Sequence, residues 1–133
     1  MSKEIKVYIA HKMSETRHRE IDEILRSKNL IPIYPEDLNP NFEKKDADQE
    51  ARNKWAQKIF DDNIKAIRSS NFIIAFTDDW DPGVMFEIGY AKASDIIIIT
   101  CSFAGYGSNI MIQKAAWKHF SHLQDLKNFL SNW

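Results

Sequence analysis

A carboxylate that interrupts an apolar helical stripe is the strongest chemical signal in this chain. The apolar positions Val84, Ile88 and Ala91 are spaced as one face of a helix. Glu87 lies three residues after Val84 and four before Ala91, on the same stripe. Burying an unpaired carboxylate costs several kcal/mol, so a glutamate in such a place is usually paired or faces a cavity. Glu87 is therefore the first candidate for a reactive group.

Three more carboxylates precede this helix, beside a tryptophan: Asp78, Asp79, Asp81 and Trp80. A connection between a strand and a helix needs only one turn-forming residue, and Asp81-Pro82-Gly83 alone would supply it. On the local pattern, an ordinary turn and a functional loop are about equally good interpretations. The density of carboxylates favours function, because neighbouring carboxylates raise one another's pKa, as acid–base chemistry requires. Trp80 would suit a flat apolar ligand.

Motifs for cofactors and metals are missing from the sequence. Its four glycines form neither of the glycine-rich phosphate-binding motifs of dinucleotide and triphosphate sites. His119 and His122 are three residues apart without Cys or Glu nearby, which is weak support for a metal site. Cys101 ends an apolar run and is more typical of a buried inert thiol than of a nucleophile. We expect no cofactor and no metal.

Composition and charge limit the possible partners. The chain has 133 residues, 44% hydrophobic and 28% charged, which suits one compact domain over residues 1–133. Its formal net charge is −1, with Lys and Arg spread along the chain, so we expect no nucleic acid polymer and no membrane as partner. The apolar runs are too short to span a bilayer, and the N-terminus leads straight into a strand. These features predict a cytoplasmic protein with small-molecule ligands.

Strand-like and helix-like patterns alternate along the chain. Strands are expected at 5–10, 30–34, 72–76 and 96–101, with a short edge strand near residue 120. Helices are expected at 15–28, 46–68, from 84 onward, at 109–118 and at 123–130, and a polar loop at 35–45. This alternation predicts an α/β fold with one doubly wound, parallel, five-stranded sheet in the flavodoxin-like order 2-1-3-4-5 and helices on both faces.

This topology would bring distant parts of the chain together. The loops after the first, third and fourth strands of such a sheet meet at one carboxyl edge. Tyr8 lies in the first strand, Glu87 follows the acidic loop after the third, and residues 105–111 follow the fourth. We expect these three segments to line one pocket.

Four segments of the chain resemble the nucleoside 2-deoxyribosyltransferases and the related nucleoside and nucleotide N-glycoside hydrolases. The segments are 7–10, 60–67, 81–91 and 109–112. The spacing from Asp81 to Glu87 and the sequence Glu87-Ile88-Gly89-Tyr90-Ala91 are the specific features, and the other segments are weak alone. The resemblance implies that Glu87 attacks the anomeric carbon and holds the sugar covalently. It also implies that Tyr8 orients this carboxylate and that Asp81 contacts the substrate.

The resemblance further implies binding residues and an oligomer. Asn63 would help to bind deoxynucleosides and nucleobases, at a position where well-known members have Asp and others have Asn. We also expect Asp79, Trp80 and Gly83 at the substrate, with Trp80 stacked on the base. Asn109 and Met111 would reach into a neighbouring subunit's site, which implies a homodimer or a larger assembly of this chain. From the residues alone, Asn109 could instead cap a helix and Met111 could belong to the core.

The function that this resemblance favours is transfer of 2-deoxyribose between nucleobases through a glycosyl-Glu87 intermediate. A carboxylate can stabilise and then capture an oxocarbenium-like state, while an acid from residues 78–81 protonates the departing base. A second base as acceptor gives transfer, and water gives hydrolysis. One alternative is an N-glycoside hydrolase of (deoxy)nucleoside 5′-monophosphates, with His11 and Lys12 on the phosphate. Another is a non-catalytic module that senses nucleosides.

Overall fold

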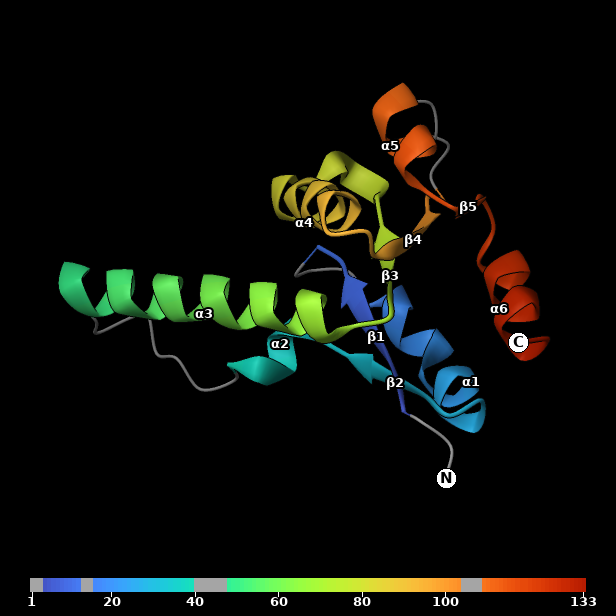
Figure 1. The fold of residues 1–133 in the computed structure, drawn as a ribbon, viewed down its shortest axis with the longest axis horizontal. Helices are drawn as coiled ribbons and strands as arrows, with labels where there is room; N and C mark the ends of the chain where they lie inside the picture. Colours follow the sequence, from blue (N-terminus) through green and yellow to red (C-terminus); the bar gives the residue numbers. More distant parts are fainter. Residues whose placement is uncertain (1–3, 13–15, 40–47, 104–108) are drawn as a thin grey trace.

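The computed structural model describes residues 4–12, 16–39, 48–103 and 109–133 (Figure 1). The strands are β1 (Ile5–Ala10), β2 (Leu30–Ile33), β3 (Phe72–Phe76), β4 (Ile97–Cys101) and β5 (Lys118–Phe120). The α-helices are α1 (Asp22–Ser27), α2 (Pro35–Leu38), α3 (Gln49–Ser69), α4 (Pro82–Ala93), α5 (Ile110–Ala115) and α6 (Leu123–Ser131). Short 3₁₀-helices span Arg17–Ile21 and Asp78–Trp80.

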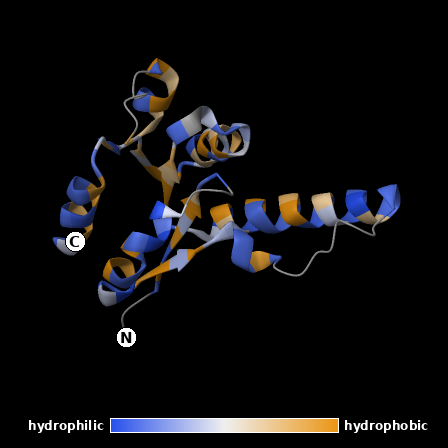
Figure 2. Ribbon diagram, turned by 180° about the vertical axis from the view of Figure 1, so that it is seen from behind, coloured by the Kyte–Doolittle hydropathy of each residue, from blue (hydrophilic) through white to orange (hydrophobic). Residues whose placement is uncertain are grey.

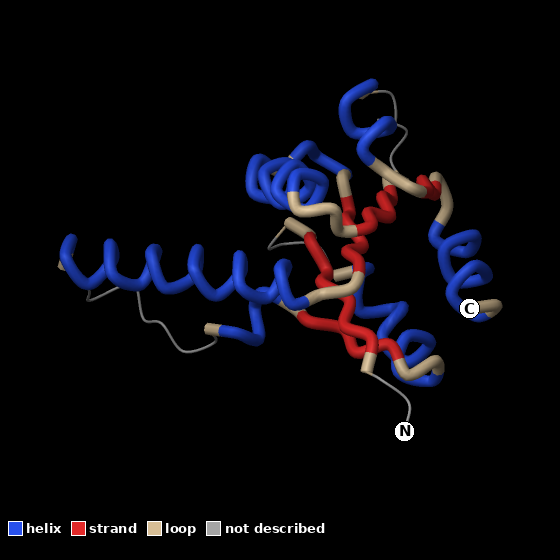
Figure 3. Tube along the Cα trace, in the orientation of Figure 1, coloured by secondary structure: helices blue, strands red, loops and turns tan. Residues whose placement is uncertain are grey.

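The five strands form one parallel sheet in the order β2-β1-β3-β4-β5, which confirms the predicted topology (Figure 3). The strand β3 lies at its centre and is buried along its whole length, as its uninterrupted apolar sequence predicts. In the register, Tyr8 of β1 lies opposite Ile73 of β3, and Ile73 lies opposite Ile98 of β4. All carboxyl ends of the strands therefore share one edge of the sheet.

The two faces of the sheet have separate hydrophobic cores. On one face, Val7 and Ile9 of β1 belong to a cluster with residues of α1 and α6. On the other face, Tyr8 and Ala10 belong to a cluster with residues of α3 and α4. Successive strand residues point to opposite faces, so the position of Tyr8 in β1 turns its side chain toward the helix that carries Glu87.

Some predicted boundaries were wrong. The segment expected as a loop at 35–45 begins with the helical turn α2, which has a proline at its start and two acidic residues in its first turn, while residues 40–47 lie outside the described part. The helix expected at 15–28 is a 3₁₀-helix followed by α1. The helix expected at 109–118 ends at Ala115, because the chain becomes extended at Ala116 and then enters β5.

The helix α3 extends well beyond the sheet (Figure 1). Figure 2 shows that hydrophobic residues recur along it, including in the part that projects away from the strands. Near this part, Phe60 of α3 contacts Phe86 of α4, with ring centroids 5.8 Å apart, and both side chains are about half exposed. In the described residues, no helix is both long and apolar enough to cross a membrane.

Candidate active site

Tyr8 and Glu87 meet on the face of the sheet covered by α4. The hydroxyl of Tyr8 donates a hydrogen bond to Oε2 of Glu87, across 79 residues of sequence. The Tyr8 side chain is completely buried, so its hydroxyl is held in one place. Tyr8 is therefore a hydrogen-bond partner for Glu87, as expected for a carboxylate on an apolar helix face.

Several neighbours act on the ionisation of Glu87. Burial raises its pKa to about 7, because desolvation disfavours the charged carboxylate, and the charge of Asp81 acts in the same direction. The hydrogen bond from Tyr8 and the charge of His11 lower the pKa and oppose this effect. Near neutral pH, Glu87 is consequently divided between its acid and carboxylate forms.

Tyr8 keeps its proton throughout the physiological range. Burial raises the pKa of Tyr8 far above its usual value, and the charge and hydrogen bond of Glu87 raise it further. Tyr8 is therefore a permanent hydrogen-bond donor to the Glu87 carboxylate and does not act as an acid or a base.

Asp81 and Gly83 start the helix α4. One carboxylate oxygen of Asp81 accepts a hydrogen bond from the backbone N–H of Val84 at 3.2 Å, as a helix cap does. A Cβ atom on Gly83 would lie 3.1 Å from the same oxygen, so the glycine leaves room for this cap. Trp80, just before it, is partly exposed and has a positive φ of 49°, a strained conformation for a tryptophan.

The carboxylate of Asp78 is held by hydrogen bonds from neighbouring loops. Its buried carboxylate accepts hydrogen bonds from the Arg17 guanidinium at 3.0 Å, the Ser102 hydroxyl at 3.2 Å and the Phe103 backbone N–H at 2.9 Å. These contacts join the loops after β3 and β4 to the 3₁₀-helix after β1. Of the three aspartates considered as acids, Asp78 is thus engaged elsewhere, and the side chain of Asp79 lies outside the described part of the structure.

Asn63, Asn109 and Met111 lie on helices around this edge. The side-chain oxygen of Asn63, on α3, is buried and has no hydrogen-bond partner among the described residues. Asn109 caps α5 by accepting hydrogen bonds from the N–H groups of Met111 and Ile112. Met111 is 75% exposed, so the alternative that it belongs to the core was wrong. The loop residues 104–108 lie outside the described part.

A cluster formed by the buried His11 and His18 and the partly buried Glu36 was missed in the sequence analysis. Glu36 accepts hydrogen bonds from Nε2 of His11 at 2.7 Å and from Nε2 of His18 at 3.0 Å. The other ring nitrogen of His11 contacts the Lys12 carbonyl oxygen at 2.7 Å. Both nitrogens of His11 are thus occupied, which argues against the predicted phosphate contact. Only the place of His11, directly after the first strand, could have indicated this cluster from the sequence.

The same cluster has potential metal ligands within 4.8 Å of one another. The rings of His11 and His18, however, are stacked at a centroid distance of 3.6 Å and an interplanar angle of 14°. A metal bound in the plane of one ring would lie far out of the plane of the other, so the lone pairs do not converge. This arrangement fits a hydrogen-bonded ion pair better than a metal site.

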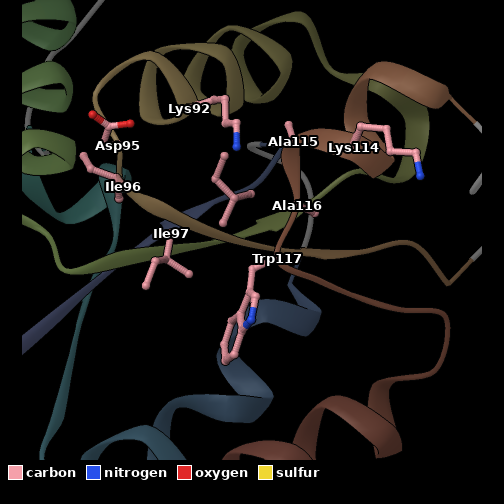
Figure 4. A pocket seen from close by; sticks show the side chains of 9 residues that line it. Lys92, Asp95, Ile96, Ile97, Lys114, Ala115, Ala116 and Trp117 are labelled. Atoms are coloured by element: carbon pink, nitrogen blue, oxygen red, sulfur yellow. The ribbon is translucent and has the colours of Figure 1, made fainter.

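A separate cavity of about 350 Å³ lies between the end of α4, the start of β4 and the connection from α5 to β5 (Figure 4). Its lining includes Lys92, Ile97 and Trp117. Because β4 starts here, the cavity is at the amino edge of the sheet, away from Tyr8 and Glu87. It is therefore not the predicted pocket.

Solved structures with a similar fold include a 2-deoxyribosyltransferase from Bacillus psychrosaccharolyticus, with 18% identity, a TM-score of 0.77 and coverage of 92% of this chain and 90% of that chain. A conserved protein from Enterococcus faecalis has 16% identity, a TM-score of 0.69 and coverage of 98% and 99%. A CMP N-glycosidase from Clostridium botulinum has 17% identity, a TM-score of 0.63 and coverage of 94% and 97%. At these identities, the likeness shows a common fold.

The sequence itself matches one protein family. The pattern of the family described as nucleoside 2-deoxyribosyltransferase matches residues 7–117, a range that includes Tyr8, Asp81 and Glu87. A comparison with curated proteins gave no match. Since the family match covers most of the chain, the protein belongs to the nucleoside 2-deoxyribosyltransferase family, which points to an enzyme acting on N-glycosidic bonds.

Proposed function

We propose that this protein transfers 2-deoxyribose from one nucleobase to another through a covalent intermediate on Glu87. The observation that carries the proposal is the hydrogen bond from the buried Tyr8 hydroxyl to the Glu87 carboxylate at the carboxyl edge of the sheet. This bond aims the carboxylate and favours its charged form, which a nucleophile needs. Family membership supports the same chemistry.

In the first half of the reaction, a carboxylate oxygen of Glu87 forms a bond to the anomeric carbon while the N-glycosidic bond breaks. The electron pair of the broken bond stays on the base nitrogen, which takes a proton from an acid. In the second half, a nitrogen of the acceptor base attacks the anomeric carbon and the ester bond to Glu87 breaks. The acceptor returns its proton to the acid, and the carboxylate is restored.

We assign the acid to Asp81 because its carboxyl group is close enough to Glu87 to act on that residue, whereas Asp78 is engaged with Arg17 and Ser102. In the reactive form the two carboxyl groups hold one proton, which is on Asp81 while Glu87 is the carboxylate. Asn63 and Trp80 would bind the base. The buried oxygen of Asn63 lacks a partner among the described residues and could accept a hydrogen bond from a base N–H. The partly exposed ring of Trp80 could stack on the base.

Asp81→Asn separates the charge of Asp81 from its role as a helix cap. Asn caps helices as well as Asp, so the stability of α4 should be retained. Loss of an acid should lower kcat by about 100-fold. Removing a like charge should also lower the pKa of Glu87 from about 7, which moves the acid limb of the kcat/KM profile to lower pH. Unchanged kcat, with an intact melting curve, would show that Asp81 is not the proton donor.

We further propose that the working enzyme is a homo-oligomer in which Met111 lies against a neighbouring subunit. In support, Met111 is 75% exposed, and the contacting rings of Phe60 and Phe86 are half exposed on the adjacent helices α3 and α4. Contiguous exposed apolar side chains, such as the rings of Phe60 and Phe86, often mark an interface between proteins.

Met111→Glu tests this assembly. In a monomer, an exposed glutamate costs almost nothing, but burying its charge between subunits costs several kcal/mol. We expect a smaller particle in light scattering and at least about a tenfold loss of activity. Ile97→Glu is the control, because Ile97 is 51% exposed but lies at the amino edge of the sheet. Equal effects of both changes, or no effect of Met111→Glu, would contradict the proposed interface.

Hydrolysis is the second candidate, because a CMP N-glycosidase has a similar fold. Chromatography of the protein incubated with deoxyinosine and adenine distinguishes the reactions, alongside a reaction without adenine and one with a deoxynucleoside 5′-monophosphate. New deoxyadenosine would support the transferase. Formation of only hypoxanthine and free deoxyribose would support a nucleoside hydrolase. Release of the base from the monophosphate alone would support a nucleotide hydrolase. If no product forms with any of a panel of bases, both transfer and hydrolysis would be contradicted, and a non-catalytic nucleoside sensor would be favoured.

A further inference from the structure

The hydrogen bonds of His11 determine where its protons are. Its Nδ1 lies 2.7 Å from the Lys12 carbonyl oxygen, and its Nε2 lies 2.7 Å from Oε1 of Glu36. Both partners are acceptors when Glu36 is ionised. A neutral imidazole has only one N–H group, so one of the two contacts would then bring two lone pairs together. The geometry therefore requires a proton on each nitrogen, which makes His11 a buried imidazolium ion.

Glu36 is able to hold this charge in place. Burial alone would raise the pKa of Glu36, but hydrogen bonds from its backbone amide, His11 and His18 outweigh burial and lower the pKa to about 2. The guanidinium of Arg19 also donates to Glu36, at 3.1 Å. Glu36 is thus a stable carboxylate, and a transfer of the His11 proton to it is unfavourable.

His18 is the neutral member of the stacked pair. Burial lowers the pKa of His18, and the charge of His11 lowers it further. Its Nε2 donates to Glu36 at 3.0 Å, while its buried Nδ1 has no partner among the described residues, as expected for a ring with a single proton. Two cations stacked at 3.6 Å would repel each other strongly. The cluster therefore contains one imidazolium, one imidazole and one carboxylate.

The charge of His11 acts on Glu87. His11 directly follows β1, three residues after Tyr8, and its positive charge favours the ionised form of Glu87, whereas the charge of Asp81 opposes it. Tyr8 is the other group that faces Glu87, and its hydroxyl remains a donor. The carboxylate of Glu36 acts on Tyr8, the donor to Glu87. Within the cluster, His11 is the group whose charge favours the ionised form of Glu87.

We propose that His11 is a positioning residue: a buried imidazolium, fixed by the Lys12 carbonyl and Glu36, that holds Glu87 in its nucleophilic carboxylate form. The consequence for catalysis rests on the proposed function, while the charge state of His11 does not. His11 and Glu36 keep their charges when Glu87 becomes a neutral glycosyl ester. The positive charge of His11 then favours re-formation of the Glu87 carboxylate when the sugar leaves.

The charge state is tested by nitrogen-15 NMR of the histidine rings in the full-length protein at pH 7. We expect the His11 ring to carry protons on both nitrogens and the His18 ring to carry one. In Glu36→Gln, His11 should become neutral. A neutral His11 ring in the unaltered protein would overturn the proposal, whatever reaction the protein catalyses.

The effect on Glu87 is tested by the pH dependence of kcat/KM in His11→Gln. Removing an opposite charge near a carboxylate should move the acid limb up by about one pH unit. Activity should then fall about tenfold at pH 6 and recover to within about twofold at pH 9. Tyr34→Phe is the matched control: it removes a hydrogen bond of 2.6 Å to Asp22 in the same core, and the acid limb should not move.

A carboxyl carbon-13 NMR titration of Glu87 separates this proposal from the proposed function. We expect Glu87 to titrate at higher pH in His11→Gln than in the unaltered protein, even if no nucleoside is turned over. If His11→Gln fails to fold, Glu36→Gln serves for the same comparison, because it removes the group that keeps His11 charged. Titration of Glu87 at the same pH in variant and unaltered protein would overturn the proposal.

Discussion

Glu87→Gln is expected to abolish cleavage of nucleosides, with a loss of at least about 10³-fold in kcat. An amide has almost the shape of the carboxylate and can accept the hydrogen bond from Tyr8, but it cannot attack the anomeric carbon. The fold should therefore be kept while the nucleophile is lost. Chromatography of the base released from deoxyinosine measures the effect, and near-normal turnover would contradict a covalent mechanism on Glu87.

The same change should stabilise the protein above neutral pH. Because burial raises the pKa of Glu87 from 4.5 to about 7, the folded protein retains a proton that the unfolded chain releases between these values. Stability therefore falls as pH rises through this window. Glu87→Gln removes the penalty and should add about 3 kcal/mol to the free energy of unfolding at pH 8, but nothing at pH 4.

Urea unfolding at pH 4 and pH 8 measures this difference. Glu23→Gln is the matched control, since Glu23 is exposed on α1 and its replacement should have little effect at either pH. A gain of the same size at both pH values would show that the effect does not come from the ionisation of Glu87.

Tyr8→Phe is expected to lower activity in two ways. The change removes the hydrogen bond that most lowers the pKa of Glu87, so this pKa should rise further above 7 and the acid limb of kcat/KM should move up by about one pH unit. Even at high pH, kcat should remain about tenfold low, because the carboxylate is no longer held in line with the anomeric carbon. Near pH 7 the two effects combine.

Profiles of kcat and kcat/KM against pH test this prediction. Tyr34→Phe removes the same atom from another buried tyrosine that donates to a carboxylate, and it should change neither profile. An acid limb at the same pH in Tyr8→Phe and the unaltered protein would show that Tyr8 does not control the charge of Glu87.

The pattern of the sequence was sufficient to predict the sheet. The alternation of strands and helices, with β3 apolar along its whole length, led to the observed strand order. The pairing of Tyr8 with Glu87 was also predictable, because both lie at the carboxyl edge and the resemblance linked them. Boundaries were less predictable: α2 begins inside a segment whose composition suggested a loop, and α5 ends when the chain must enter β5.

The cluster of His11, Glu36 and His18 could not be predicted for a physical reason. Its members come from three segments, and only the packing of α2 against the end of β1 brings Glu36 to the two rings. The sequence showed His11 and Lys12 after the first strand, and the resemblance to nucleotide hydrolases suggested that these two residues contact a phosphate. In the structure, both ring nitrogens of His11 are occupied.

The most direct test of the central claim is mass spectrometry of the protein quenched with acid during turnover of deoxyinosine. We predict a population heavier by one deoxyribosyl group, with the added mass on the peptide that contains Glu87, and its absence in Glu87→Gln. Rapid turnover with the sugar on another residue, or an adduct that persists in Glu87→Gln, would contradict the proposed role of Glu87 as the nucleophile.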